Sequence, residues 1–492
     1  MKPAVNLSSK NIKTENEHIW TSFLCILLIV LFSANLYILW PGQMTPDSHA
    51  QYEMALHGNY NDHHPPLMSL VWGVLNHIYP GSGLLFLFHL ILLYGAAAFL
   101  IFATNDKVAQ LLFLFIPLLS PVSFYSSMIW KDVGFGAAYT FVFALLSYYI
   151  LRKKRVSKIK IISVFAISWY GTAIKFQAQF ALPFLMLLFS YWIMQCRWSS
   201  KTFLHGALYT VLMISAIRTV DWILIGKEGK LHSWQNVRLY DIAGIFKLTQ
   251  KNFLPLFIKN HPRYSESKMA SRFNYERVDD LTGTYDAPLI LGSNKTERSE
   301  LHKAWLAAIL AAPIAYAQHR WAIFYRTLSI EPLERFDQLD LSSYEGLTFI
   351  RRIKQTADDS LKKEQRNEML NYQQKITQSL FVLIKIIRSC SRLIIWIPLL
   401  ILYLFIGIYF RRNLASAPLI CMSFAIICFL GAIFFLTMAS AIRYVYFVFC
   451  LIHSCHGLAY LAYTQSRRRL KTESPCKPSS TQNTSNATTQ AQ

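Results

Sequence analysis

The sequence PGQMTPDSHAQYEMALHGNYNDHHPP, residues 41–66, directly follows the first long apolar segment of the chain. It is the densest cluster of ionisable side chains near any membrane boundary that the sequence predicts: Asp47, His49, Glu53, His57, Asp62, His63 and His64. Its two final prolines stop one helix and start a new element at Leu67. Ionisable groups at the edge of lipid are costly and are usually retained for a function. We therefore interpret this stretch as half of an active site.

The composition of the chain is that of a polytopic membrane protein. Of its 492 residues, 53% are hydrophobic and 15% aromatic, and several apolar runs are long enough to cross a bilayer. The formal net charge of +22 raises the alternative of a nucleic-acid-binding protein. Many basic residues, however, stand in short clusters at the ends of apolar runs, where membrane topology explains them, and others could hold an anionic lipid head group. We expect no nucleic-acid partner.

Several common functional signatures are missing from the sequence. No two of the eight cysteines form a CxxC pair, so neither a structural zinc site nor a disulfide framework is indicated. No P-loop, Rossmann glycine pattern or GxSxG motif is present. The first apolar segment, residues 20–40, is too long for a signal-peptide core and lacks a small-residue cleavage pattern. It is expected to remain as a helix.

The positive-inside rule fixes the predicted topology. We expect an all-α fold of about ten transmembrane helices with both termini in the cytoplasm, because this places RKKRVSKIK (152–160) and SRRRLK (466–471) inside. Residues 67–79 must then lie in the interface as an amphipathic helix. The expected spans are residues 20–40, 83–104, 108–121, 133–151, 161–174, 180–196, 203–226, 393–410, 414–437 and 442–463.

This topology divides the chain into five parts. They are a cytoplasmic N-terminus (1–19), an N-terminal transmembrane module (20–226) with the candidate catalytic loop 41–82, a mainly helical extracytoplasmic region (227–380), a C-terminal transmembrane module (381–465) and a disordered cytoplasmic tail (466–492). Helices are expected over 302–328 and 360–376, and residues 379–392 are expected at the head-group surface. His319, Arg320 and Arg326 share a helix that could face the site cavity, but we favour a solvated helix face.

Two carboxylates share the predicted extracytoplasmic face: Asp47 follows the first span, and Asp132 stands in the tripeptide WKD at another boundary. A carboxylate there can take a proton from an attacking hydroxyl or bind a divalent cation such as Mg²⁺ or Mn²⁺. The alternatives are structural. Asp47 or Ser48 could cap a helix that Gly58 closes, and Asp132 could neutralise Lys131.

Histidines of the same loop could contribute further chemistry. His63 or His64 could ligate a metal, bind a phosphate or polarise an acceptor. The alternative is a histidine packed in the turn beneath the two prolines, and we favour that interpretation for His49, His57 and His77.

Three basic residues, Lys131, Lys175 and Arg443, stand at the extracytoplasmic ends of predicted spans. Cations there could hold the phosphate of a membrane-embedded donor, arginine in a bidentate manner, although each could instead extend along lipid to reach the interface. Gln177 and Gln179 are close enough to donate hydrogen bonds to a sugar.

Together these residues resemble the GT-C class of integral-membrane glycosyltransferases, which includes the protein O-mannosyltransferases and the bacterial lipid A aminoarabinose transferases. The chain looks most like a poorly characterised bacterial group with a PDS…HHPP loop and a WKD turn. The matching segments are TPDS (45–48) with Gln51 and Tyr52, NDHHPP (61–66), WKD (130–132), HSWQ (232–235) and DIAG (241–244). The better-known members have an Asp-Glu pair where this chain has Asp47 alone, which leaves metal dependence open.

The resemblance implies inverting transfer of a sugar from a polyprenyl-phosphate-linked donor to a cell-envelope glycan, lipid or protein. It implies a bacterial inner membrane with the active site on the extracytoplasmic face. The implied roles are base for Asp47, supporting acid or metal ligand for Asp132, acceptor or phosphate contact for His63 or His64, donor-phosphate binding for Lys131, Lys175 and Arg443, and substrate binding for Gln51, Tyr52 and Gln177.

The alternative is a transporter or flippase for a lipid-linked glycan. Transporters, however, place charges near mid-membrane and often contain repeats, whereas these charges gather at one face.

Overall fold

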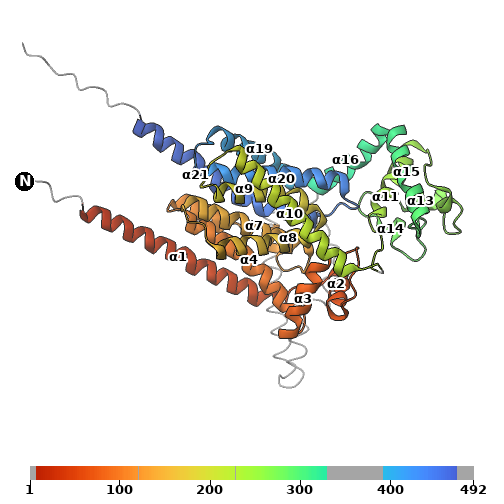
Figure 1. The fold of residues 1–492 in the computed structure, drawn as a ribbon, viewed down its shortest axis with the longest axis horizontal. Helices are drawn as coiled ribbons and strands as arrows, with labels where there is room; N and C mark the ends of the chain where they lie inside the picture. Colours follow the sequence, from red (N-terminus) through yellow and green to blue (C-terminus); the bar gives the residue numbers. More distant parts are fainter. Residues whose placement is uncertain (1–6, 120, 228, 330–391, 474–492) are drawn as a thin grey trace, which may run out of the picture.

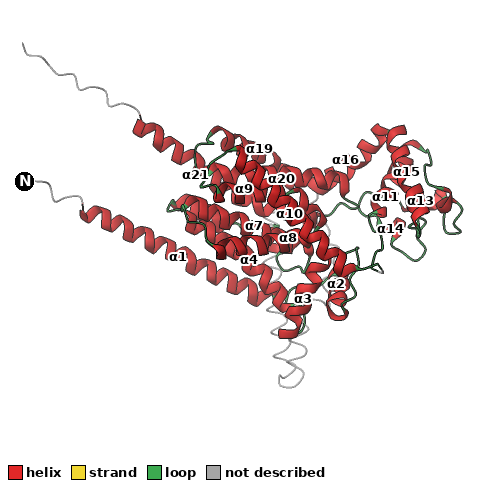
Figure 2. Cartoon of the chain, in the orientation of Figure 1, coloured by secondary structure: helices red, strands yellow, loops and turns green. Residues whose placement is uncertain are grey.

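The computed structural model describes residues 7–119, 121–227, 229–329 and 392–473. Within these ranges the chain forms helices and no strand, as Figure 2 shows, together with two isolated β-bridges. The predicted all-α class is therefore confirmed for this part of the chain.

Six helices of the described chain are long and apolar enough to cross a membrane, which makes this an integral membrane protein. They are α1 (Leu7–Leu39), α4 (Gly83–Ala103), α7 (Lys131–Leu151), α10 (Ser200–Ile225), α20 (Ser416–Leu436) and α21 (Tyr446–Glu473). Shorter helices occupy the other four expected spans: α5 (Lys107–Leu114), α8 (Lys158–Ala173), α9 (Leu182–Ile193) and α19 (Leu393–Tyr409). Because a span needs about 20 residues at 1.5 Å each, the count of about ten spans stays a prediction.

Helix α7 is the centre of the bundle. It packs against α4, α8, α9 and α21, and most of its side chains are buried on every side, as expected of a helix that is apolar all round. The contact with α21 depends on Gly136, since a Cβ there would lie only 2.6 Å from the ring of Tyr446. The first residues of this central helix are Lys131 and Asp132.

The loop after α1 contains α2 (Pro46–His57) and α3 (Pro66–Ile78). The helix expected before Gly58 is present, and Gly58 ends it with a φ of +70°. Its N-cap is Thr45, not Asp47 or Ser48. Proline suits the first turn of a helix, so α2 begins at Pro46, and Ser48 Oγ accepts the N–H of Thr45 at 3.1 Å. The interfacial position expected for α3 stays a prediction.

The described part of the expected extracytoplasmic region, residues 229–329, is a helical unit with its own apolar core. It contains α11 (Gln235–Thr249), α12 (Leu256–Lys259), α13 (Glu266–Arg272), α14 (Asp279–Thr282), α15 (Lys295–Ala311) and α16 (Pro313–Ser329). The helix expected over 302–328 is divided in two, because the residue before Pro313 is driven out of the helical conformation. We call this unit the α11–α16 region.

The remaining sequence expectations concern the ends of the chain and the segment 330–391. The helix expected at 360–376 lies outside the described residues, as do the tail from 474 onward and all but the last residue of the segment 379–392 that was expected at the head-group surface. Helix α21 continues to Glu473, so the start of the expected tail is helical, in keeping with its Arg and Lys content. The N-terminal end of α1 and the C-terminal end of α21 lie at one end of the bundle, and the α11–α16 region lies at the other (Figure 1).

Candidate active site

A short piece of paired backbone joins the first loop to the segment before α7. Gln43 forms a parallel bridge with Met128, where its N–H donates to Ser127 at 2.8 Å and its carbonyl accepts from Ile129 at 3.0 Å. Ser48 Oγ donates to the Ile129 carbonyl at 2.8 Å. These bonds hold the first turn of α2 beside the first turn of α7, and so bring together the two segments that carry the predicted carboxylates.

Asp47 is paired with an arginine from the distant C-terminal part of the chain. Arg443 Nη1 lies 2.7 Å from Asp47 Oδ2, and the two side chains are 25% and 35% exposed, so solutes can reach them. The guanidinium lies 5.3 Å from the ring centre of Trp130 and 5.4 Å from that of Tyr444, which adds cation–π attraction. Trp130 is itself fixed by an Nε1–H bond of 2.8 Å to Thr45 Oγ1.

Asp132 forms a buried ion pair with Lys175. Their side chains are only 3% and 2% exposed, and Lys175 Nζ bonds Asp132 Oδ1. The same Nζ lies 5.1 Å from the ring centre of Tyr444, which makes this pair a neighbour of the Asp47–Arg443 pair. One structural alternative is thereby wrong, because the buried Lys175 does not extend to the interface. Asp132 makes its direct contact with Lys175, although its negative charge also acts on Lys131.

Lys131 turns instead to the first loop, where its Nζ donates to His64 Nδ1 at 3.0 Å. Burial, together with the positive charge of Lys131, lowers the pKa of His64 to about 2, so the imidazole stays neutral and accepts this bond. The His63 ring stands 4.7 Å away, and its Nδ1 lies 3.2 Å from Ser233 Oγ. We call Asp47, His64, Lys131, Asp132, Lys175 and Arg443 the charged cluster.

Acid is expected to destabilise the protein through His64. Unfolded histidine titrates near 6.5, whereas the folded pKa is about 2, so the unfolded chain binds more protons below pH 6.5. The stabilisation is complete above that pH and is lost as pH falls towards the folded value. Going from pH 7 to 5 should cost about 2 kcal/mol at this site. Thermal unfolding of wild type and His64→Asn at both pH values measures it, and an equal acid shift in both proteins would contradict it.

Asp62 attaches the first loop to the start of the α11–α16 region. Its two carboxylate oxygens accept the N–H groups of Leu231 at 2.9 Å and His232 at 3.0 Å, and its own N–H donates to Gly229 at 3.0 Å. Charge-assisted bonds of this kind are among the stronger ones in proteins. The NDHHPP and HSWQ segments, far apart in sequence, therefore meet beside the charged cluster.

The predicted substrate-binding residues occupy different positions. Gln51 is buried and donates to the Asp47 carbonyl at 3.2 Å. Tyr52 donates to Asn76 Oδ1 at 2.9 Å. Both contacts support α2 from within the protein. Gln177, in the short helix η1 (Phe176–Phe180), is half-buried close after Lys175. A role in substrate binding stays a prediction for all three.

The charge balance of the cluster favours an anion over a metal ion. Three cationic side chains, Lys131, Lys175 and Arg443, face two carboxylates, and each carboxylate is already paired. Among the described residues no group of three or more His, Cys, Asp or Glu side chains could hold a metal ion. Net positive surroundings repel a divalent cation and attract phosphate. Binding of Mg²⁺ or Mn²⁺, which the sequence left open, stays a prediction.

A buried ionic network holds the turn that carries Arg443. Arg320 Nη2 donates to Asp241 Oδ2 at 2.7 Å, and Nη1 donates to the Thr437 carbonyl at 2.7 Å. Asp241, His319 and Arg320 are fully buried, so the solvated face expected for His319 and Arg320 is wrong. Gly244 is needed here, since a Cβ would stand 2.0 Å from the His319 ring.

A second tie reaches the same turn. Arg277 forms an antiparallel bridge with Ala439, and Ser440 donates its N–H to the Glu276 carbonyl at 2.9 Å. The α11–α16 region thus contacts the segment that leads to Arg443 at two points, at Thr437 and at residues 439–440. Sequence reasoning missed the contacts of this network. It also missed the contact of Arg443 with Trp130, which was recognised only as part of WKD, and with Tyr444. The available signal was an aromatic residue next to a cation at two boundaries.

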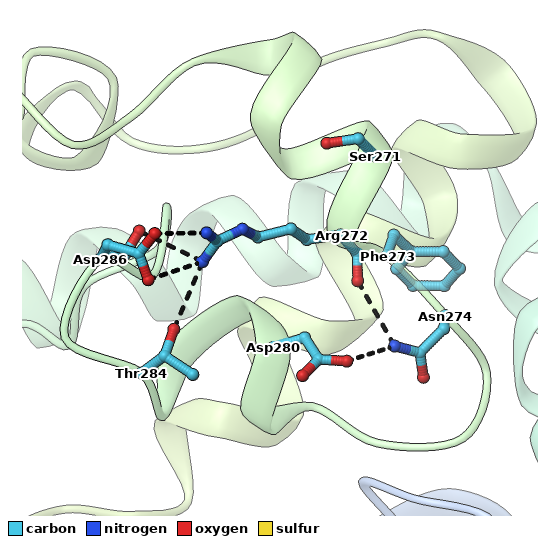
Figure 3. Close-up of a pocket in the computed structure, with 7 residues that line it drawn as sticks. All are labelled: Ser271, Arg272, Phe273, Asn274, Asp280, Thr284 and Asp286. Atoms are coloured by element: carbon cyan, nitrogen blue, oxygen red, sulfur yellow. Dashed lines mark hydrogen bonds and ion pairs between the residues drawn. The ribbon is translucent and has the colours of Figure 1, made fainter.

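A separate surface pocket of about 460 Å³ lies in the α11–α16 region. Figure 3 shows the side chains of α13, α14 and the following loop around it, with Arg272 bonded to Asp286 and Thr284. Asn274 donates to Asp280 at 2.8 Å. None of its lining residues belongs to the charged cluster, so this pocket is not the site described above.

No family model matches the chain, and comparisons with curated proteins and with solved structures also find no match. Fold and site together define a class: an all-α integral membrane protein whose central helix begins in a cluster of paired charges. The relationship to the GT-C class stays a prediction.

Proposed function

We propose that this protein is a membrane glycosyltransferase that moves a sugar from a polyprenyl-phosphate-linked donor to a hydroxyl group of an extracytoplasmic acceptor. The observation that carries the proposal is the accessible Asp47–Arg443 pair next to the buried Asp132–Lys175 pair. A donor of this kind combines an apolar chain with a phosphate. An apolar helix bundle that ends in a net positive cluster is suited to both parts.

In the proposed reaction the acceptor oxygen attacks C1 of the sugar, and its proton passes to Asp47. The bond between C1 and the phosphate oxygen breaks, and its electron pair stays on that oxygen, so polyprenyl phosphate leaves. Attack opposite the leaving group inverts C1. Arg443 and Lys131 stabilise the charge that grows on the phosphate, an effect worth several kcal/mol in a site partly shielded from water.

The Asp47–Arg443 contact gives this scheme a resting state. While Asp47 Oδ2 is in contact with Arg443, this oxygen is not available for the acceptor proton. A donor phosphate offers Arg443 two oxygens in a bidentate arrangement. We propose that Arg443 moves from Asp47 to the phosphate when donor binds, which releases Asp47 for the acceptor proton. Asp132 and Lys175 neutralise one another and stay paired while Arg443 moves. They form the buried part of the site next to the exchanging residues.

The decisive experiment uses the purified protein in proteoliposomes with a radiolabelled polyprenyl-phosphate sugar and an envelope fraction as acceptor. A transferase consumes the donor, whereas a flippase for lipid-linked glycans moves it across the bilayer intact. Movement of uncleaved donor without transfer would overturn the proposal in favour of that alternative.

Arg443→Gln is expected to lower transfer by at least about 100-fold, because it removes a positive group that faces the leaving phosphate. The initial rate of label transfer measures the loss. Arg326→Gln is the matched control, since Arg326 lies in an exposed pair with Glu276 outside the charged cluster and should keep the wild-type rate. Equal rates for Arg443→Gln and wild type would remove Arg443 from the mechanism.

A further inference from the structure

We infer that the corner between α15 and α16 rests on the lipid bilayer and is a membrane-docking surface of the α11–α16 region. The last turns of α15 and the outward side of α16 expose a continuous set of apolar residues. This apolar corner consists of Leu306, Ala307, Leu310, Ala311, Ile314, Ala317, Trp321 and Tyr325. Leu310 is 82% exposed, Ile314 73% and Trp321 56%. The inference does not depend on the proposed transferase activity.

The apolar corner presents no charge to its surroundings. Between Leu306 and Tyr325 the only ionisable side chains apart from tyrosines are His319 and Arg320, and both are fully buried in the network with Asp241. The first turns of α15, by contrast, expose Lys295 and Lys303. A helix that faces water carries charges on its outer side, and contiguous exposed apolar surface marks a contact.

The position of the corner identifies the bilayer as the occupant. Helix α16 packs against α20, with the Phe324 ring 5.6 Å from that of Phe434. Phe435 at the end of α20 is 54% exposed, and α20 is a candidate membrane span. The lipid that covers the outer side of α20 therefore continues onto α16, which Figure 1 shows extending from the end of α20 to α15.

The residue types along α16 fit this placement. Trp321 and Tyr325, nearest to α20, have ring centres 6.4 Å apart, and tryptophan and tyrosine are the residues enriched at membrane–water interfaces. Leu310 and Ile314 extend the apolar surface away from them. The opposite side of α16 holds Arg320, which bonds Asp241 and the Thr437 carbonyl. One helix thus couples a lipid-facing surface to the turn before Arg443.

The test places the photo-reactive residue p-benzoylphenylalanine at Leu310 in the full chain. The protein is reconstituted into vesicles of phosphatidylethanolamine and phosphatidylglycerol, irradiated, and analysed by mass spectrometry. Phospholipid adducts are expected at position 310. The same replacement at Tyr285, which is 97% exposed but outside the apolar corner, should give at least about tenfold less adduct, because a side chain in water is far from acyl chains.

Ile314 provides a second position, so that failure of one variant to accumulate leaves the test intact. A cross-linked dimer without lipid adducts would overturn the inference in favour of a second copy of the chain as occupant. Cross-links to residues 330–391 without lipid adducts would assign the corner to the chain itself. Equal lipid labelling at positions 310 and 285 would also overturn it, because contact would then not be specific to the apolar corner.

Discussion

Asp47→Asn is expected to lower the rate of sugar transfer by about 10²–10⁴-fold, the usual contribution of a positioned general base, while the protein still folds. The substituted amide is nearly the same size, and its oxygen can still accept a hydrogen bond from Arg443, which lies 2.7 Å from Asp47 Oδ2. What is lost is the ability to take the acceptor proton. The initial rate of radiolabel transfer in proteoliposomes measures the effect.

The same variant should not weaken donor binding. Removing the charge of Asp47 releases Arg443 from its ion pair, so the KM for donor is expected to stay level or fall while kcat collapses. Glu53→Gln is the matched control. Glu53 stands on the same helix as a 65% exposed carboxylate paired with His57, and its loss should leave both constants unchanged. A near-normal kcat for Asp47→Asn would remove this residue as the base.

Local sequence patterns predicted the elements of the site better than their partners. The first loop, its short helix ended by Gly58 and the WKD segment were all visible in the sequence, because prolines, glycine and charges mark boundaries. The Asp47–Arg443 contact was not, since it joins opposite ends of the chain. The same is true of Arg320, whose partner lies 79 residues away. The sequence around Arg320 is typical of an amphipathic helix with its charges in water. Only the structure shows that Arg320 is buried against Asp241.

Several expected helix boundaries agree with the structure to within about two residues, as for α4 and α20, but two others failed for a different physical reason. The length of an apolar run indicates how many residues are removed from water, but it does not indicate the residue at which the helix ends. Helix α5 ends at Leu114 within a predicted span that continued to residue 121, because Pro117 excludes the helical conformation from the residue before it. The 302–328 segment is divided at Pro313 by the same effect. Hydropathy therefore located the six long apolar helices of the described chain, whereas proline set the end of α5 and the break between α15 and α16.

Arg320→Met is expected to destabilise the protein by about 3–5 kcal/mol, the usual cost of leaving one partner of a buried ion pair uncompensated. Asp241 would keep the Trp305 Nε1–H bond of 2.8 Å but lose its cation, and the Thr437 carbonyl would lose its donor. Thermal unfolding of the purified protein measures the loss. Arg272→Met is the control: the Arg272–Asp286 pair lies on the surface, where solvent screening makes ion pairs weak, so little change is expected.

The companion variant Asp241→Leu separates the ion pair from ordinary packing. Each single substitution leaves one buried charge alone, whereas the double variant Asp241→Leu/Arg320→Met leaves none. The double variant should therefore be more stable than the sum of the two losses by about 0.5–3 kcal/mol, the range of coupling between contacting residues. Strictly additive losses would mean that Asp241 and Arg320 stabilise the fold independently. The turn before Arg443 would then be held by the Arg320–Thr437 bond and the Glu276–Ser440 bond, and the buried carboxylate would have another purpose.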